Sequence, residues 1–196
     1  MNILIACEFS GIVRDAFSKR GHLAVSCDLI PTESPGPHYV GDVEDILGSG
    51  WDMMIAHPPC IYLTVTANRS FLNNPERWEK RLEAVKFVHR LLNANIPRIC
   101  IENPKGAIST HIRKPDQYIQ PYEFGHNVSK ATGLWLKNLP LLVGTEGVEP
   151  EWVIFPSGKR MSKTHANTPS TNSEENRKIR NRTYRGVAEA MADQWG

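Results

Sequence analysis

Four short apolar runs, separated by stretches of helical or polar character, leave few folds open to this chain. The runs cover Asn2–Cys7, His22–Cys27, Asp52–Ala56 and Arg98–Glu102. Apolar runs of this length are typical of buried strands, and strands that alternate with helices form a parallel sheet with crossover helices. We therefore expect an α/β fold with a mostly parallel sheet.

Helices are expected between these runs. Ser10 can cap the first helix, and a short helix near Glu44–Leu47 follows a short strand at Tyr39–Val40. The longest helix begins at Asn74, where asparagine can cap the first turn and the proline after it fits that turn, and runs to about Asn93. Its apolar side chains recur at helical spacing and are expected to face the core: Trp78, Leu82, Val85, Val88 and Leu92.

The pattern changes after Pro104. Tyr118–Phe124 and Gly133–Leu136 look extended, and we expect them as antiparallel strands at the edge of the sheet. Gly144–Asn176 is polar and turn-rich, which predicts a loop excursion over about 144–176. A final helix is expected near Tyr184–Trp195, with one apolar side chain on each turn: Val187, Met191 and Trp195.

The composition favours one compact domain over residues 1–196. The chain is 40% apolar and 22% charged, which is typical of a soluble globular protein with its own core. It has no apolar run of membrane-spanning length and no signal-peptide pattern at its start, so we expect a cytoplasmic protein without a membrane partner. The net charge of +2 is too small to indicate nucleic-acid binding by itself. No CxxC pair occurs, so no metal site is expected, and free thiols are: Cys7, Cys27, Cys60 and Cys100.

Polar or reactive residues follow each apolar run. In an open parallel sheet, ligands bind at the carboxyl ends of the strands, so these residues predict a ligand site at that edge. In chain order they are Glu8-Phe9-Ser10-Gly11, Asp28, Gly41-Asp42, His57-Pro58-Pro59-Cys60 and Glu102-Asn103-Pro104.

Three of these residues have both a binding interpretation and a structural one. Gly11 could let a ligand approach the backbone and the free amides of the helix start, or it could only form a tight turn. Asp28 could accept hydrogen bonds from ribose hydroxyls or form a turn. Asp42 could reach an adenine amino group or cap the helix that follows.

Cys60 and Glu102 point more directly to chemistry. Two prolines hold the backbone rigid before Cys60, and a thiolate fixed at the ligand edge is a strong nucleophile. The alternative is a chance cysteine in a proline turn. Glu102 ends a strand expected to neighbour the Cys60 strand, where a carboxyl could share a proton with a ring nitrogen. The alternative is a partly exposed acid at a strand end.

This set of residues resembles the cytosine-5 DNA methyltransferase family over about the first 105 residues. Phe9-Ser10-Gly11 is similar to the family's F-x-G turn, Gly41-Asp42 to its G-D pair, Pro58-Pro59-Cys60 to its Pro-Pro-Cys, and Glu102-Asn103 to its Glu-Asn. The resemblance implies a Rossmann-like class I S-adenosylmethionine-dependent methyltransferase fold, mostly parallel with an antiparallel edge. It implies S-adenosylmethionine as cofactor, bound by Phe9, Ser10, Gly11, Asp28, Asp42 and Pro58. It also implies catalysis by Cys60 and Glu102 and substrate binding by Pro59 and Asn103.

The chain departs from the family pattern after the Pro-Pro-Cys motif. Ile61 stands where the family usually has Gln, and the family's arginine-containing strand is replaced by a segment that offers Lys130 and Thr132, which we expect to be catalytic. The large target-recognition region is missing, as in compact phage-type members, for which the host cytoplasm is the expected location. We therefore expect weak sequence preference.

The resemblance predicts methylation of carbon 5 of cytosine in DNA through a covalent Cys60 adduct. The base would be flipped out of a duplex, and the loop Ile61–Asn73 could close over it. The partner is duplex or single-stranded DNA, with a free pyrimidine nucleotide as the alternative. A non-catalytic binding protein also stays open, as does the oligomeric state. A basic cluster could contact phosphates or be a solvated face: Arg177, Lys178, Arg180, Arg182 and Arg185.

Overall fold

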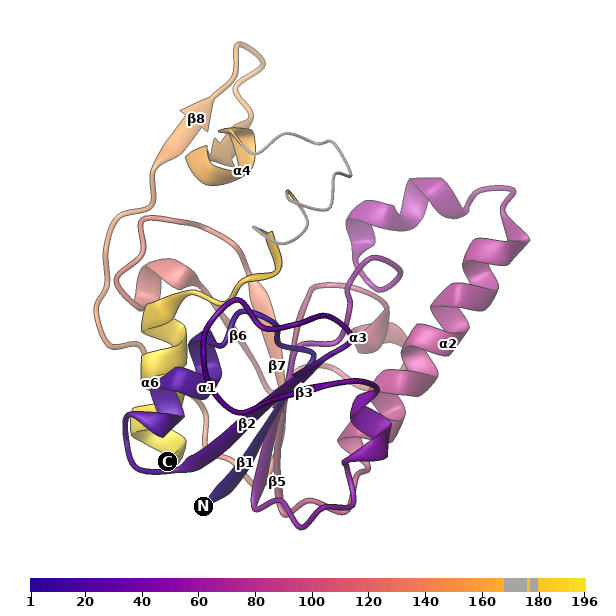
Figure 1. Ribbon diagram of the computed structural model, residues 1–196. Coiled ribbons are helices and arrows are strands. Elements are labelled where there is room, and N and C mark those ends of the chain that lie inside the picture. Colours follow the sequence, from indigo (N-terminus) through magenta and orange to yellow (C-terminus); the bar gives the residue numbers. More distant parts are fainter. Residues whose placement is uncertain (168–175, 177–179) are drawn as a thin grey trace.

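Seven strands form one sheet in the computed structural model, which describes residues 1–167, 176 and 180–196 (Figure 1). Within these residues the strand order is β3-β2-β1-β4-β5-β7-β6. The strands are β1 (Asn2–Ala6), β2 (Leu23–Asp28), β3 (His38–Val40), β4 (Met53–Ala56), β5 (Arg98–Pro104), β6 (Gln117–Ile119) and β7 (Thr132–Lys137). The first five pair in parallel, and β7 runs antiparallel to both of its neighbours. This is the expected Rossmann-like class I arrangement, a mostly parallel sheet with an antiparallel edge.

Helices cover both faces of the sheet. On one face α1 (Ile12–Ser18) packs against α6 (Arg185–Trp195), and on the other lie α2 (Pro75–Leu92) and α3 (Ala107–His111) (Figure 1). Successive side chains of β1 enter opposite layers: Ile3 and Ile5 join the cluster under α1 and α6, and Leu4 joins the one under α2. Burial on both faces explains why the strands read as unbroken apolar runs.

Helix α2 begins where the sequence predicts, but its buried face is different. The Asn74 side chain accepts a hydrogen bond from the Arg77 amide at 3.1 Å and caps the helix. Trp78 and Leu82, which were expected in the core, are 52% and 54% exposed. The expectation is wrong for these two residues because the Trp78 ring packs edge-on against Phe71 outside the sheet, with ring centroids 5.2 Å apart. The residues buried on α2 are Arg81, Val88 and Leu91.

The antiparallel edge is confirmed in part. Gly133–Leu136 lies within β7, as predicted. Tyr118–Phe124 was expected to be extended throughout, but β6 ends at Ile119 and a 3₁₀ helix, η3 (Pro121–Glu123), follows. Glu123 explains the break, because its carboxylate accepts from the Gln120 amide at 2.7 Å and closes a capping box.

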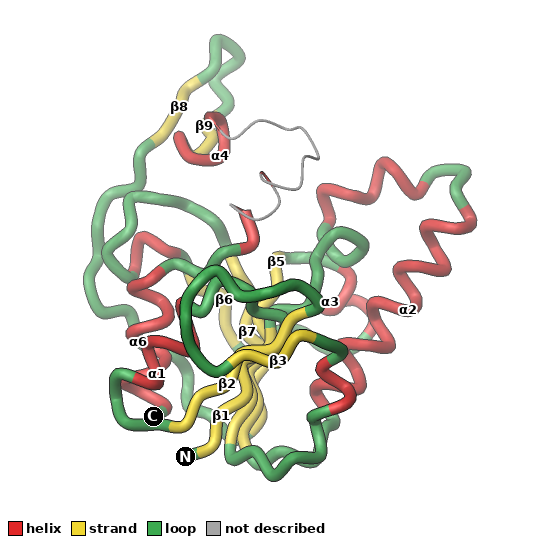
Figure 2. Tube along the Cα trace, viewed as in Figure 1, coloured by secondary structure: helices red, strands yellow, loops and turns green. Residues whose placement is uncertain are grey.

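The excursion after Gly144 is more ordered than the predicted loop. It contains a hairpin of β8 (Trp152–Ile154) and β9 (Arg160–Ser162), followed by α4 (Lys163–Asn167), which projects away from the sheet (Figure 2). A contact within the hairpin stabilises it: the Arg160 guanidinium lies 4.8 Å from the Trp152 ring centroid. Residues 168–175 of the predicted loop lie outside the described residues.

Within the described residues there are also two 3₁₀ helices, η1 (Val43–Asp45) and η2 (Val65–Phe71). The predicted final helix is confirmed as α6, and its apolar positions Val187, Met191 and Trp195 are buried. Among the described helices, none combines the length and apolar character needed to cross a bilayer.

Candidate active site

His57 and Glu102 lie side by side at the carboxyl ends of β4 and β5. These strands pair in parallel with Ala56 opposite Ile101, so the next residue of each strand faces its neighbour. Nδ1 of His57 lies 3.2 Å from Oε2 of Glu102. The predicted adjacency of the Cys60 and Glu102 strands is confirmed.

The backbone around Cys60 is fixed from both sides. The Asn103 side chain donates to the carbonyl of Pro58 at 2.7 Å, and Pro58 is buried while Pro59 is exposed. After the prolines, the carbonyl of Cys60 accepts hydrogen bonds from the amides of Leu63 and Thr64 at 2.9 and 3.0 Å. These contacts hold the thiol in place. The contacts of Pro59 and Asn103 with a substrate stay a prediction.

The Cys60 thiol is half-buried among groups of both charges. Burial raises the pKa of Cys60, the positive charge of Lys130 lowers it, and the carboxylate of Glu102 raises it. The net direction is upward, so the thiol is protonated near neutral pH in the free protein. A substrate or proton acceptor that takes up this proton would favour the thiolate.

Glu102 is an ionised carboxylate in the same surroundings. Burial raises its pKa, but the hydrogen bond and charge of His57, the charge of Lys130 and a hydrogen bond with Thr132 outweigh burial, and the pKa is below its usual value. The site therefore rests with a proton on sulfur and a negative charge on Glu102.

Lys130 and Thr132 reach this site from the start of β7. Lys130 donates from Nζ to the carbonyl of Arg180 at 2.9 Å, and its Nζ lies 5.9 Å from the ring centroid of Tyr184. Thr132 is buried and donates from Oγ1 to the carbonyl of Lys130 at 3.2 Å. The structure thus brings the four residues predicted to be catalytic to one place.

A small cavity of about 30 Å³ lies beside Glu102. Lys130, Thr132 and Tyr184 line it, together with residues 181–183 ahead of α6. This volume suits water rather than a pyrimidine ring. A ring can bind beside Glu102 only after the segment 181–184 shifts.

Replacing Lys130 is expected to slow alkylation of Cys60. Lys130→Met removes the charge that lowers the pKa of Cys60, so less thiolate is present at pH 8 and iodoacetamide should react severalfold more slowly. Lys130→Arg keeps the charge and is the matched control. Peptide mapping separates this thiol from Cys27, whose pKa burial raises to about 11. Equal rates in Lys130→Met and Lys130→Arg would refute the electrostatic role.

The two acids predicted to bind the cofactor lie on neighbouring strand ends. Asp28 ends β2 half-buried, where burial raises its pKa, and it accepts from the amide of Ile30 at 3.3 Å. Its carbonyl accepts from the amide of Gly41 at 3.0 Å, which brings the turn that carries Asp42 alongside. Asp42 is exposed and accepts from the amide of Glu44 at 3.0 Å, so it caps η1 whatever else it binds.

The start of α1 differs from the sequence expectation. Gly11 has φ of 73°, and a side chain there would come within 2.5 Å of the Arg14 guanidinium, so the turn requires glycine. Its contact with a cofactor stays a prediction. The amides of Val13 and Arg14, expected to be free for a ligand, donate to the Glu8 carboxylate at 2.7 and 3.3 Å. Glu8 therefore caps the helix together with Ser10, whose hydroxyl accepts from the Ile12 amide at 3.3 Å and donates to Glu8 at 3.2 Å. The only sequence feature that points to this cap is the position of Glu8, an acid five residues before Val13.

Arg14 is buried, and no pattern in the sequence predicts this. Its guanidinium is fully buried and donates to the carbonyls of Ser34 and Pro35 at 3.0 and 3.1 Å and to Ser26 at 3.2 Å. It thereby ties the loop after Asp28 to α1.

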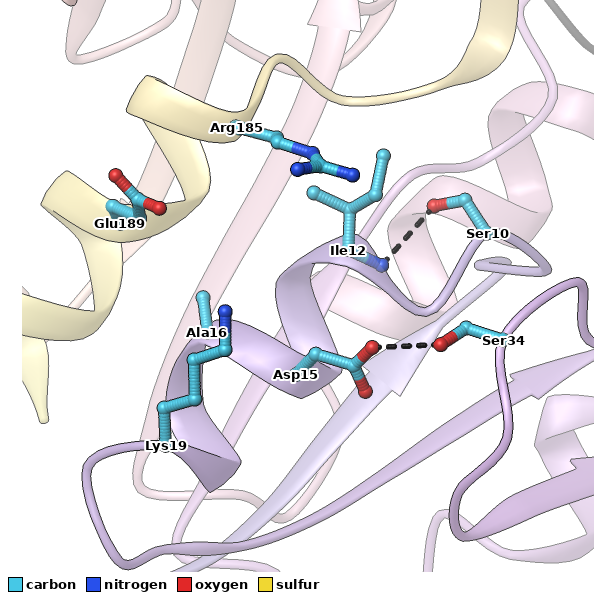
Figure 3. Close-up of a pocket in the computed structure, with 8 residues that line it drawn as sticks. All are labelled: Ser10, Ile12, Asp15, Ala16, Lys19, Ser34, Arg185 and Glu189. Carbon is cyan, nitrogen blue, oxygen red and sulfur yellow. Dashed lines mark hydrogen bonds between the residues drawn. The ribbon is translucent and has the colours of Figure 1, made fainter.

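A second cavity, of about 180 Å³, lies beside this turn between α1 and α6 (Figure 3). Arg185 of α6 extends toward Ile12 and Ser10, while Asp15 accepts a hydrogen bond from Ser34 at 2.8 Å. Charged side chains of α1 and α6 line the cavity, and so does Ser10, one of the residues predicted to bind the cofactor.

Two members of the predicted basic cluster have defined surroundings in the structure. Arg182 donates to the carboxylate of Glu33 at 3.0 and 2.7 Å, and Arg185 lines the cavity beside α1. Arg177 and Lys178 lie outside the described residues.

Comparisons with known proteins give distant similarity to solved structures and nothing closer. No protein-family model and no curated protein matches the chain. Among solved structures the chain is similar to one titled "Structure Analysis of Entamoeba histolytica methyltransferase EhMeth", with 13% identity and a TM-score of 0.48. The match covers 78% of this chain and 58% of that one. A likeness this distant says nothing about activity.

Proposed function

We propose that this protein is an S-adenosylmethionine-dependent methyltransferase that methylates carbon 5 of cytosine in DNA. The observation that carries the proposal is the placement of the Cys60 thiol and the Glu102 carboxyl at the ends of two adjacent strands, each held by its neighbours. A nucleophile and an acid–base group in this arrangement can act on two atoms of one flat ring.

The reaction needs an activated ring, because carbon 5 of cytosine is a poor nucleophile. Addition of the Cys60 thiolate forms a bond from sulfur to carbon 6 and makes carbon 5 enamine-like. Glu102, which is ionised at rest, takes up the proton that the thiol gives up and passes it to ring N3 in the same step, so the charges balance. Later loss of the carbon 5 proton, elimination of Cys60 and return of the N3 proton restore the free protein.

The residues at the ends of β1 and β2 fit the cofactor. Asp28 and Asp42 offer carboxylates that can accept hydrogen bonds from hydroxyl and amino groups, and the apolar residues Phe9 and Pro58 follow the ends of β1 and β4. S-adenosylmethionine, when bound there, supplies an electrophilic methyl group.

Loss of one of these acids should weaken cofactor binding. Asp28→Ala removes a charged acceptor and is expected to cost about 1–3 kcal/mol of binding free energy by isothermal titration. Asp52→Ala is the matched control, because Asp52 bonds the amide of Asn2 at the opposite end of the sheet. Unchanged affinity in Asp28→Ala would remove Asp28 from the cofactor site.

The proposed substrate follows from the size of the site. A base must leave its stack to meet Cys60, and the segment 181–184 must shift to admit it. Specific recognition of a duplex normally buries about 1,000 Å² or more of protein surface, and the short hairpin of β8 and β9 offers little surface for it. We therefore expect DNA methylation with weak sequence preference.

The experiment is transfer of tritiated methyl groups to duplex DNA, single-stranded DNA and dCMP under one condition. The proposal expects transfer to DNA spread over many cytosine contexts. Strict methylation of one long duplex sequence would contradict the weak preference, and transfer to dCMP alone would move the substrate to free nucleotides. Inactivity on all three, with cofactor bound, would favour a binding protein.

A further inference from the structure

His57 precedes the two prolines, and the proposed chemistry gives it no role. Its side chain is 8% exposed, and its Nδ1 lies 3.2 Å from Oε2 of Glu102. Its Nε2 is buried and has no hydrogen-bond partner among the described residues. The ring is thus bonded toward the acid–base group and unsatisfied on the other side.

An imidazole at this position lowers the stability of the fold if its only role is to pack. A buried polar atom without a partner costs about 1–3 kcal/mol. An apolar side chain would avoid that cost, because the neighbouring Met53–Ala56 are all buried. The contact with Glu102 is therefore what the imidazole contributes.

The backbone that carries the ring is fixed before any ligand arrives. The His57 amide donates to the carbonyl of Ala6 at 3.0 Å, and the next residue, Pro58, is held by Asn103. These contacts keep His57 beside the end of β5, and the contact of Nδ1 with Glu102 orients the ring.

Charged groups surround the pair from several elements. Glu8 faces His57 from the end of β1: burial raises the pKa of Glu8, and the charge of His57 lowers it. Lys130 faces Glu102 from β7, and Cys60 faces it from the loop after β4. His57 thus lies between two carboxylates, of which Glu8 is occupied in capping α1.

We propose that His57 is a positioning residue for Glu102, and that its Nδ1–H holds the carboxylate in place for the substrate ring. The catalytic part of this role rests on the function proposed above. The hydrogen bond to Oε2 leaves the carboxyl able to turn its other oxygen to ring N3.

Two amide variants separate the hydrogen bond from simple packing. In His57→Asn the side-chain amide can occupy the place of Nδ1 and donate to Glu102. In His57→Gln the amide lies one bond farther out, near the place of Nε2. Both bury an uncharged amide, so they are matched in polarity.

The first readout is the titration of Glu102, followed by the ¹³C shift of its labelled carboxyl group and assigned with Glu102→Gln. A hydrogen-bond donor and a positive charge favour the carboxylate, so their loss moves the titration midpoint to higher pH. We expect the midpoint to rise in the order wild type, His57→Asn, His57→Gln. This measurement needs no activity and no cofactor.

The second readout is methyl transfer. Misplacement of a catalytic group can cost about 100-fold, so kcat should fall by up to that factor in His57→Gln and by less in His57→Asn, with KM for the cofactor unchanged. Identical midpoints in the two variants and in wild type would overturn the proposal, and so would failure of both variants to fold. If wild type transfers no methyl group but the midpoints move as expected, the function proposed above fails and the positioning contact stands.

Discussion

Cys60→Ser is expected to abolish detectable methyl transfer while the protein binds its cofactor with unchanged affinity. A serine hydroxyl ionises far less than a thiol near neutral pH, so it cannot add to carbon 6 of the ring. The fold should survive, because Cys60 is half-buried and its carbonyl, rather than its sulfur, accepts the hydrogen bonds from Leu63 and Thr64. Transfer of tritiated methyl groups and isothermal titration of the cofactor measure the two properties separately.

The same assay with Cys60→Ala tests whether the hydroxyl retains any function. Both variants should be inactive, and both should unfold at the wild-type temperature. Normal turnover by Cys60→Ser would make Cys60 a structural residue and the covalent mechanism wrong.

Glu102→Gln is expected to lower kcat by about 10²–10⁴-fold, the usual contribution of a general acid–base group. A glutamine amide can donate a hydrogen bond to ring N3 but cannot pass it a proton. The amide also loses the charge that His57 and Lys130 compensate, so some loss of stability should accompany the variant. Steady-state kinetics, with thermal unfolding measured alongside, distinguish the two effects.

Glu83→Gln is the matched control, because Glu83 is exposed on α2 and pairs only at the surface with Lys86. It should leave kcat unchanged. If Glu102→Gln and Glu83→Gln were equally active, proton transfer through Glu102 would be ruled out.

The fold could be predicted because its strongest signals are local. Continuous apolar runs such as Ile3–Ala6 are buried on both faces of the sheet, and Asn74 caps α2 as its sequence indicates. The sequence misjudged Trp78 and Leu82 because helical spacing shows that apolar residues share a face, but not what covers that face. It missed the hairpin after Gly144 because short strands with polar turns carry weak periodicity.

The sequence predicts which positions form the candidate site, but not which side chains contact one another there. Strand ends located Cys60 and Glu102, since parallel strands bring their carboxyl ends together. The Glu8 contact is local, but an acid at this distance before the helix matches none of the usual capping patterns. The contact of His57 with Glu102 depends on the register between β4 and β5, which are distant in sequence.

The most direct test of the account is covalent trapping on DNA that carries 5-fluorocytosine. Fluorine at carbon 5 cannot leave as a proton does, so the adduct formed after methyl transfer cannot eliminate the sulfur. Wild type with S-adenosylmethionine should give a denaturant-stable protein–DNA complex whose cross-linked peptide contains Cys60, and Cys60→Ser should give none. Methyl transfer to ordinary DNA without any trapped complex, or a complex at another residue, would contradict the account.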